Sequence, residues 1–494
     1  MNLKAGTPND ANRDYVPLDI PGTDMTVNEN GNNSQVYPER LRRFSEVLAD
    51  GLTDCWYEYV PESYDGSKAV PLIVSNHGGL MNGWAQAVYS SWTLLSEREG
   101  FLCVFPDAHE LQMWMLQGMA AKVRANPELV LPIPADPEDW HDNHDIRFVR
   151  ALIERMKEKY NIDPGRIYMH GMSMGHMMTD QFARFHGDIL AGASGSGAGC
   201  MESQLYEADG TVRNWGGPVP MWISHPELNG MDGPREQENA QQQMSRAYWS
   251  QINGVRSLPE IRIIGEDNFA FYHGDKADLV WLDIKNRDHG QTLDEAYLIW
   301  NYLFSGRRRL PDGTIAREPG RLSMEGDAHA LAFAAGCRKV WRRGAPKELP
   351  AAPVLWDKLK YHGLEGGHMV RGQYLCVPLR YLAEVFGSSY ETNAEGTEAT
   401  VTLRDGRCAQ FARGVIGCLV DGELVSMYCE TLQREGELLV SVEWFCRWFF
   451  NGNVSVCNGV AYVTDHFAEL SAFMAELIRE LLSDRPAGKE EGKT

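Results

Sequence analysis

The fold can be inferred from one stretch of this chain, Arg166-Ile167-Tyr168-Met169-His170-Gly171-Met172-Ser173-Met174-Gly175. Its first five residues form a short, mostly apolar run with strand propensity, and the turn-forming Asp163-Pro164-Gly165 precedes it. From His176 to Phe185, apolar side chains recur at the spacing of one helix face. The stretch therefore predicts a strand, a tight turn at Ser173 and a helix.

The turn has the pattern Gly-x-Ser-x-Gly, with Gly171 and Gly175 on either side of Ser173. Small residues at both flanks permit a sharp strand-to-helix turn that projects the serine hydroxyl above the edge of the sheet. The helix N-terminus and the backbone N–H of Met174 can then stabilise the negative charge that develops during acyl transfer. The pattern predicts Ser173 as a nucleophile, and a serine in an ordinary glycine-rich turn is the alternative.

Length and charge limit the classes of protein to consider. A chain of 494 residues exceeds one ordinary core, so two domains are expected. The formal charge of −21 disfavours nucleic acid and anionic membrane surfaces as partners.

The sequence contains no apolar run long enough for a membrane span, and its first residues lack a signal-peptide core. We expect a cytoplasmic protein if the sequence is complete, and a secreted or cell-surface protein if a signal peptide has been removed. The oligomeric state stays open.

The ten cysteines are scattered and include no Cys-x-x-Cys pair. This spacing favours neither a zinc site nor a redox motif, so we expect buried free thiols, with disulfides in the C-terminal part as the alternative. No cofactor is expected.

Strand-like and helix-like segments alternate between residues 55 and 305. This order predicts an α/β fold in which helices cover both faces of a mostly parallel sheet. The expected strands are 55–60, 70–76, 101–106, 166–170, 218–223 and 279–284, and the expected helices are 85–98, 146–160, 176–185 and 293–304.

A serine nucleophile needs a base and an acid that orients the base. His289 is the candidate base, because it follows the apolar run 279–284 in a polar loop; a surface histidine is the alternative reading. Glu227 and Asp232 are the candidate acids in the loop after the run 218–223, and we favour Asp232. The second oxyanion donor is expected to be the backbone N–H of Gly79, beside that of Met174.

The segment Trp140-His141-Asp142-Asn143-His144-Asp145 contains two His and two Asp residues, which are side chains that can bind a divalent metal ion. Asp and Asn immediately before a helix are ordinary N-cap residues, and no His-Glu-x-x-His motif accompanies them, so we predict no metal site. Trp140, His141 and His77 are instead candidates for the substrate pocket.

The remaining segments suggest five regions. We expect an N-terminal arm at 1–50 with a helix near 38–49, a catalytic domain at 51–306, and a linker at 307–353 with a helix near 328–341. An accessory α+β domain is expected at 354–466, followed by a C-terminal helix and disordered tail at 467–494. Within the accessory domain, Val377–Phe386 aligns with Val440–Phe449, which indicates a degenerate strand–helix–strand repeat.

Four segments, 74–79, 100–107, 145–160 and 166–175, together resemble the polyhydroxybutyrate depolymerase and feruloyl esterase families of α/β-hydrolases. The resemblance implies an α/β-hydrolase fold and a Ser-His-Asp ester hydrolase without a cofactor. Its acid motif has Asp where this chain has Asn229, and the family spacing to a helix Trp, here Trp249, suggests that Asp232 takes the role after an insertion.

A second resemblance concerns Val377–Gly387, which is similar to the copper amine oxidase N-terminal-like, or stalk, domain. It implies no copper, and such a domain could mediate self-association or surface attachment. The expected function is therefore a serine carboxylic-ester hydrolase acting on polyester or oligoester, feruloyl or small acyl ester substrates. The alternatives are an acyltransferase or peptidase with the same triad, and a non-catalytic binding protein on a hydrolase scaffold.

Overall fold

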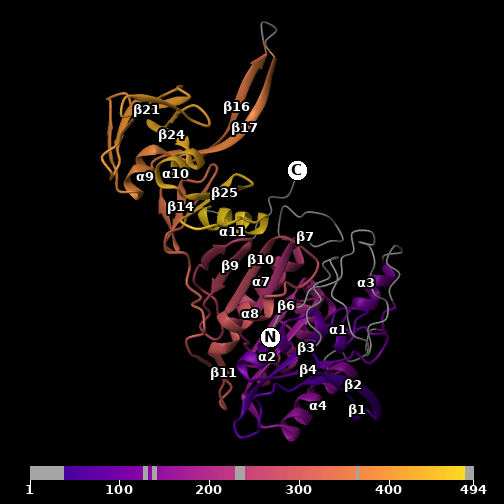
Figure 1. Ribbon diagram of the computed structural model, residues 1–494. Coiled ribbons are helices and arrows are strands. Elements are labelled where there is room, and N and C mark those ends of the chain that lie inside the picture. Colours follow the sequence, from indigo (N-terminus) through magenta and orange to yellow (C-terminus); the bar gives the residue numbers. More distant parts are fainter. Residues whose placement is uncertain (1–37, 126–131, 136–141, 229–239, 363–366, 484–494) are drawn as a thin grey trace, which may run out of the picture.

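The computed structural model describes residues 38–125, 132–135, 142–228, 240–362 and 367–483. A large sheet with its helices forms one lobe, the large-sheet lobe. Several smaller sheets, drawn in orange and yellow, form a second lobe, the accessory lobe (Figure 1). Among the described residues, no helix has the length and hydropathy needed to cross a bilayer.

The large sheet has ten strands in the order β1-β2-β4-β3-β5-β6-β7-β10-β9-β8. The strands from β4 to β10 in that order run parallel, which confirms the predicted mostly parallel sheet, and β1, β2, β9 and β8 add antiparallel edges. The strands are β1 Arg42–Ala49, β2 Leu52–Tyr59, β3 Val70–Asn76, β4 Leu102–Pro106, β5 Ile162–Met172, β6 Gly192–Ser196, β7 Met221–Leu228, β8 Glu260–Ile264, β9 Asp267–Tyr272 and β10 Leu279–Asp288.

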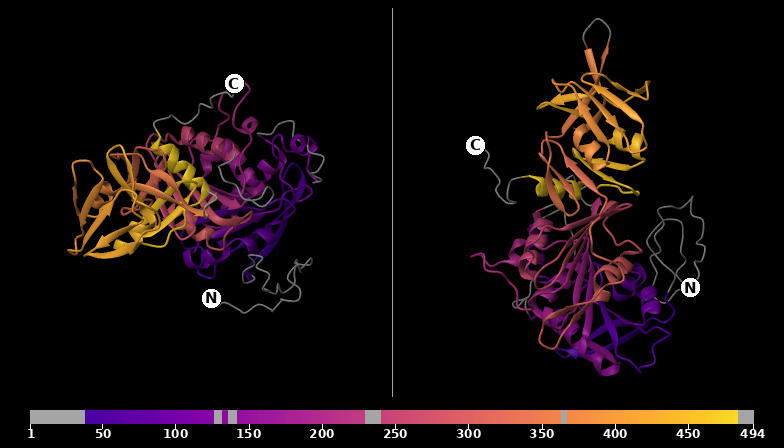
Figure 2. Two further views of the ribbon diagram at one scale, coloured as in Figure 1. Left: turned by 90° about the horizontal axis from the view of Figure 1, so that it is seen from above. Right: turned by 90° about the vertical axis from the view of Figure 1, so that its left-hand side faces the viewer.

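Helices cover both faces of this sheet (Figure 2). The helix expected at 85–98 is two helices, because Ser90 and Ser91 separate α1 from α2. The helices of the large-sheet lobe are α1 Gly83–Tyr89, α2 Trp92–Glu99, α3 Met119–Ala125, α4 His144–Lys159, α5 Met174–His186, α6 Glu202–Leu205, α7 Ala240–Asn253 and α8 Glu295–Tyr302.

The helix predicted at 38–49 is wrong, because residues 42–49 form strand β1 at the edge of the sheet. Arg42 faces Glu58 and Phe44 faces Trp56 across the antiparallel pair with β2. Cross-strand partners of this kind stabilise a strand whose polar sequence has little preference of its own. These residues therefore belong to the large-sheet lobe and not to an N-terminal arm.

The segment expected to be a linker also contains strands. β13 Leu331–Ala334 and β14 Lys339–Arg342 occupy the region where a helix was predicted, and that prediction is wrong. β13 pairs with β26, so the long-range partner decides the conformation of this short apolar run. The five-stranded sheet is β15-β14-β13-β26-β25, so the accessory lobe draws strands from before residue 354. Its remaining strands in this sheet are β15 Ala345–Glu348, β25 Asn453–Cys457 and β26 Val460–Thr464.

The two aligned segments of the accessory lobe form the same succession of elements. β17 runs into α9 and β24 runs into α10, and the strands pair antiparallel with Val377 opposite Val440. β18 and β25 then follow the two helices. These elements are β17 Gly367–Pro378, α9 Leu379–Val385, β18 Ser389–Thr392, β24 Glu437–Ser441 and α10 Val442–Phe450.

The other strands complete three further sheets: a pair of β11 Arg307–Arg309 and β12 Ile315–Arg317, a four-stranded sheet β16-β17-β24-β23, and a five-stranded sheet β18-β19-β20-β21-β22. Their bounds are β16 Val354–His362, β19 Glu398–Thr402, β20 Cys408–Ala412, β21 Gly417–Val420, β22 Glu423–Ser426 and β23 Leu432–Arg434.

The C-terminal helix α11, Ala472–Leu482, lies between the two lobes (Figure 1). Its Phe473 packs on Trp281 of β10 with ring centroids 5.1 Å apart. One cluster of buried residues contains Trp281, Phe473 and also Tyr462 of β26, so the hydrophobic core continues from one lobe into the other.

Candidate active site

Ser173 lies in a tight turn between β5 and α5, as the sequence predicts. Its backbone has φ 55° and ψ −118°, in a region that residues with a side chain rarely occupy. A Cβ atom on Gly171 would collide with the carbonyl oxygen of Gly175, and one on Gly175 would collide with that of Asn76. Both flanking positions therefore require glycine, because backbone atoms that cannot move approach them closely.

His289 follows β10, at the same carboxyl edge of the parallel strands as Ser173. Its Nε2 lies 2.9 Å from Ser173 Oγ, within hydrogen-bond distance for proton transfer. The imidazole is exposed, and Gly197, which has φ 70°, lies against it. The structure thus brings together the two residues predicted as nucleophile and base.

A buried hydrogen-bond chain holds the loop that carries His289. Gln291 Nε2 donates to His170 Nε2 over 2.7 Å, and His170 Nδ1 consequently donates to Ser75 Oγ over 3.0 Å. Burial lowers the pKa of His170 to about 3, so this imidazole stays neutral. Gln291 was not predicted from the sequence, and its place two residues after the candidate base is the one local signal of its role.

Gly79, in the loop after β3, lies close to Met174, the first residue of α5. A Cβ on Gly79 would lie 2.9 Å from Met174 Sδ and 3.0 Å from Met113 Sδ. Gly79 therefore lets this loop approach the start of α5 closely. Their backbone N–H groups remain the predicted oxyanion donors.

His77 supports this loop from below and is completely buried, in contrast to the substrate-pocket position expected from the sequence. Its Nδ1 donates to the carbonyl of Gly78 over 2.6 Å, and its Nε2 accepts from the backbone N–H of Ala108 over 2.9 Å. The indole of Trp114 donates to the His77 carbonyl over 2.8 Å. Burial lowers the pKa of His77 to about 4, so its imidazole stays neutral while its hydrogen bonds hold the loop in place.

The acid is the remaining member of the predicted triad. Glu227, which the sequence placed in a loop, lies in β7, and its two carboxylate oxygens accept the backbone N–H groups of Asn286 and Ala472 over 3.0 and 2.9 Å. The favoured candidate Asp232 and the pocket candidates Trp140 and His141 lie outside the described residues. Trp249 is buried in α7 and donates to Asp180 over 2.7 Å.

A second carboxyl group lies behind the serine. Glu295, in the first turn of α8, accepts a hydrogen bond from the hydroxyl of Ser196, whose carbonyl in turn accepts from the backbone N–H of Ser173 over 2.8 Å. Burial raises the pKa of Glu295 to about 7. Ser196, in strand β6 beside Ser173, therefore contacts the carboxyl group of Glu295, which can carry a proton near neutral pH.

Comparison with protein-family models finds no match. Among curated proteins, the chain is 26% identical over 159 residues to acetylxylan esterase A of Talaromyces purpureogenus, covering 31% of this chain and 36% of that protein. It is 29% identical over 150 residues to feruloyl esterase B of Thermothelomyces thermophilus, covering 29% and 45%. It is 25% identical over 145 residues to poly(3-hydroxyalkanoate) depolymerase C of Paucimonas lemoignei, covering 28% and 30%. The chain therefore spans less than half the length of each of these relatives.

Among solved structures, the acetyl xylan esterase from Aspergillus awamori aligns with a TM-score of 0.38 and 16% identity, covering 52% of this chain and 97% of that one. The arrangement of the sheet, the turn at Ser173 and the helices on both faces is that of an α/β-hydrolase. The large-sheet lobe thus has the α/β-hydrolase fold, and the curated relatives named here are two esterases and a depolymerase.

Proposed function

We propose that this chain is a serine carboxylic-ester hydrolase that works through an acyl-enzyme. The observation that carries the proposal is the 2.9 Å separation of His289 Nε2 and Ser173 Oγ at a strained strand-to-helix turn. A half-buried serine in a strained turn that contacts an imidazole is the arrangement that activates a hydroxyl for attack on a carbonyl.

In the proposed reaction, His289 removes the proton of Ser173 as the oxygen attacks the ester carbonyl. The backbone N–H groups of Met174 and Gly79 stabilise the oxyanion, and the protonated imidazole then gives its proton to the departing alcohol. Water, activated by the same imidazole, hydrolyses the acyl-enzyme and restores the serine.

Asp232 is the acid in this proposal and orients the imidazole of His289. Glu227 is a weaker candidate, because both of its carboxylate oxygens already accept backbone N–H groups. These two hydrogen bonds hold the carboxylate between the backbones of β10 and α11.

The substrate proposal follows the chemistry of the relatives named above. We propose acetyl or feruloyl esters of carbohydrates and short hydroxyalkanoate polyesters as candidates, all of which are cleaved by acyl transfer to serine. A panel of one acetyl, one feruloyl and one 3-hydroxybutyrate oligomer ester, compared by kcat/KM, would rank them.

A fluorophosphonate probe tests the nucleophile directly. The wild-type protein should be labelled at Ser173, whereas Ser173→Ala should remain unlabelled and lose about 10³-fold or more in ester turnover. Ser203→Ala, which removes an exposed hydroxyl from α6, is the matched control and should be labelled like the wild type. Equal labelling of wild type and Ser173→Ala would refute the proposal.

A further inference from the structure

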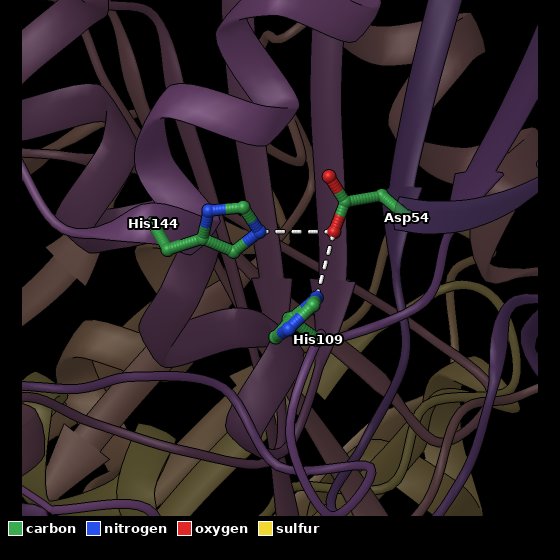
Figure 3. Close-up of side chains that lie close together, drawn as sticks. All are labelled: Asp54, His109 and His144. Atoms are coloured by element: carbon green, nitrogen blue, oxygen red, sulfur yellow. Dashed lines mark hydrogen bonds and ion pairs between the residues drawn. The ribbon is translucent and has the colours of Figure 1, made fainter. Parts of the chain in front are cut away.

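Asp54, His109 and His144 form a cluster outside the candidate active site. Asp54 comes from β2, His109 follows β4, and His144 is the first residue of α4. His109 Nδ1 and His144 Nε2 each lie 2.9 Å from the same atom, Asp54 Oδ1 (Figure 3). Two imidazole nitrogens from distant parts of the chain thus converge on one carboxylate.

The carboxylate of Asp54 is deeply buried, with 2% of the residue exposed. Its second oxygen, Oδ2, has no hydrogen-bond donor within reach among the residues that the structure describes. Leaving a buried carboxylate oxygen without a hydrogen-bond donor is energetically unfavourable. Asp54 Oδ2 is therefore a buried acceptor that is hydrogen-bonded to none of the residues that the structure describes.

The donor set suits a transition-metal cation. Two imidazoles and one carboxylate are common ligands of Zn²⁺, and ligand atoms 2.0–2.1 Å from a tetrahedral Zn²⁺ lie about 3.3 Å apart. The distances of 2.9 Å in the cluster would need to lengthen by only a few tenths of an ångström. His109 has 22% of its side chain exposed, which leaves a direction from which an ion and a water ligand can enter.

The surroundings of His144 match those of a metal-bound histidine. Its Nδ1, the nitrogen that faces away from Asp54, donates to Asp50 Oδ2 over 2.7 Å. Arg147 in turn holds Asp50 through contacts of 2.8–3.0 Å. A carboxylate that orients a histidine in this way is the usual partner of a metal-bound imidazole, whose Nε2 would release its proton and its hydrogen bond to Asp54 on binding the ion.

We propose that Asp54, His109 and His144 bind one divalent transition-metal cation of the Zn²⁺ class, with water completing its coordination. The proposal departs from the absence of a metal site expected for the segment 140–145, because two of the three ligands lie far from that segment in the sequence. Asp145, which belongs to it, instead accepts the backbone N–H groups of His109 and Met115 over 3.2 and 2.7 Å.

The position of the cluster indicates what the ion would do. His109 immediately follows Ala108, whose backbone N–H donates to His77 beneath the candidate oxyanion loop. The backbone N–H of Leu80 donates to the carbonyl of Gln112 over 3.0 Å, which ties the same segment to that loop. An ion at His109 would therefore stabilise the segment that braces Gly78 and Gly79, as a structural site and not as a participant in the reaction.

The proposal can be tested by metal binding alone, without an ester substrate. The full-length protein, freed of metal by a chelator, is titrated with Co²⁺ while its visible absorption is recorded, and with Zn²⁺ in competition with a chromogenic chelator. We expect one equivalent bound with micromolar or tighter affinity, a d–d absorption band for Co²⁺, and a rise in Tm on adding Zn²⁺.

Two substitutions decide whether the ion occupies this cluster. His144→Ala and the more conservative His109→Gln should each weaken binding at least about tenfold and remove the Co²⁺ band. Fluorophosphonate labelling of Ser173 or the near-UV circular dichroism spectrum shows that each variant is folded. His466→Ala, in the separate group of Asp327, Asp465 and His466, is the matched control and should bind like the wild type.

The proposal is overturned if the folded wild-type protein binds neither ion with micromolar affinity, because the cluster is then only hydrogen-bonded. It is also overturned if both histidine variants bind Zn²⁺ as tightly as the wild type, or if the loss follows His466→Ala instead. None of these outcomes depends on whether the chain hydrolyses esters.

Discussion

Glu295 shows how one buried carboxyl group can give the protein a pH-dependent stability. The residue is 1% exposed, and burial, together with the negative charge of Asp294, raises its pKa from 4.5 to about 7. Asp267 is shifted in the same direction, to about 7, by burial and by neighbouring carboxylates that include Glu295. Both groups hold a proton in the folded state at pH values where the unfolded chain has lost it.

We predict that the contribution of Glu295 to the free energy of unfolding falls as the pH rises from about 4.5 to 7. In this window its carboxyl group is protonated in the folded state and ionised in the unfolded state, so its contribution is complete below pH 4.5 and is lost as the pH passes the folded pKa. The full change is about 3 kcal/mol. Because the buried, neutral His77 and His170 contribute with the opposite sign, urea unfolding at pH 5 and pH 8 must compare the wild type with a variant of Glu295.

Glu295→Gln is the matched variant, because the amide keeps the size of the side chain and cannot ionise. The variant should gain stability relative to the wild type at pH 8, and this gain should shrink at pH 5, where the carboxyl group of the folded wild type is protonated. Parallel pH profiles for the wild type and the variant would contradict the prediction.

The residue-level predictions from the sequence depended on local chemistry. The turn at Ser173 is specified by Gly171 and Gly175, whose positions allow no Cβ, so the nucleophile could be inferred from five residues. His289 could be inferred because it follows an apolar strand. The roles of His170, Gln291 and Asp54 could not, since each depends on a partner from a distant strand or loop.

At the scale of elements, Glu227 connects β7 to the start of α11. Its carboxylate accepts the backbone N–H of Ala472, in the first turn of that helix, and that of Asn286 in the segment leading to His289. A carboxylate at a helix N-terminus satisfies an otherwise unpaired N–H and interacts favourably with the helix dipole. Glu227 therefore contributes to the docking of a helix, which the sequence pattern around it did not indicate.

We predict that Glu227→Gln lowers the free energy of unfolding by about 1–3 kcal/mol but reduces ester turnover less than tenfold. Asp232→Asn should do the reverse, with little change in stability and a loss in kcat of about 10³–10⁴-fold, because the imidazole then adopts the wrong tautomer. Urea unfolding and steady-state kinetics of both variants provide the comparison. A large kcat loss in Glu227→Gln with none in Asp232→Asn would exchange the two roles.

The elements that the sequence predicted correctly are those with strong local patterns. The buried parallel strands β3 and β4 are continuous apolar runs, and α4 has a clear apolar face closed by Asn143 at its N-cap. The two wrong helices, at 38–49 and 328–341, lie where β1 and β13 obtain their stability from partners distant in the chain. Short segments of mixed pattern take the conformation that their partners impose. The resemblance to a stalk domain stays a prediction.

At the scale of the whole molecule, the two lobes share a hydrophobic core. Trp281, Ile261 and Ile263 of the large sheet belong to the same buried cluster as Phe473 of α11. Backbone hydrogen bonds add to this contact, because Gly265 donates to Phe467 over 3.0 Å and accepts from Glu469 over 2.7 Å. The boundary at residue 306 that the sequence suggests therefore does not separate two independent cores.

We predict that a fragment of residues 1–306 does not fold stably. Removing the rest of the chain would expose Ile261, Ile263 and Trp281, each of which is now buried, and each such side chain contributes about 1.5–3 kcal/mol by its burial. Loss of several of them approaches the whole stability of a typical domain, about 5–15 kcal/mol. Size-exclusion chromatography and near-UV circular dichroism should find the fragment aggregated or without fixed tertiary structure, and fluorophosphonate labelling of Ser173 should be lost.

Phe473→Ala in the full-length chain tests the same contact on a protein that can still fold. Truncating this side chain should lower the free energy of unfolding by about 3–5 kcal/mol, because it leaves a cavity against Trp281. Trp448→Ala is the matched control, since this residue of α10 is 52% exposed, and it should lower the free energy of unfolding far less.

A monomeric, folded 1–306 fragment that reacts with the probe as fast as the full chain would show that the large-sheet lobe folds independently. Because the cluster joins strands of the sheet to the C-terminal helix, we expect both changes to destabilise the lobe that carries Ser173.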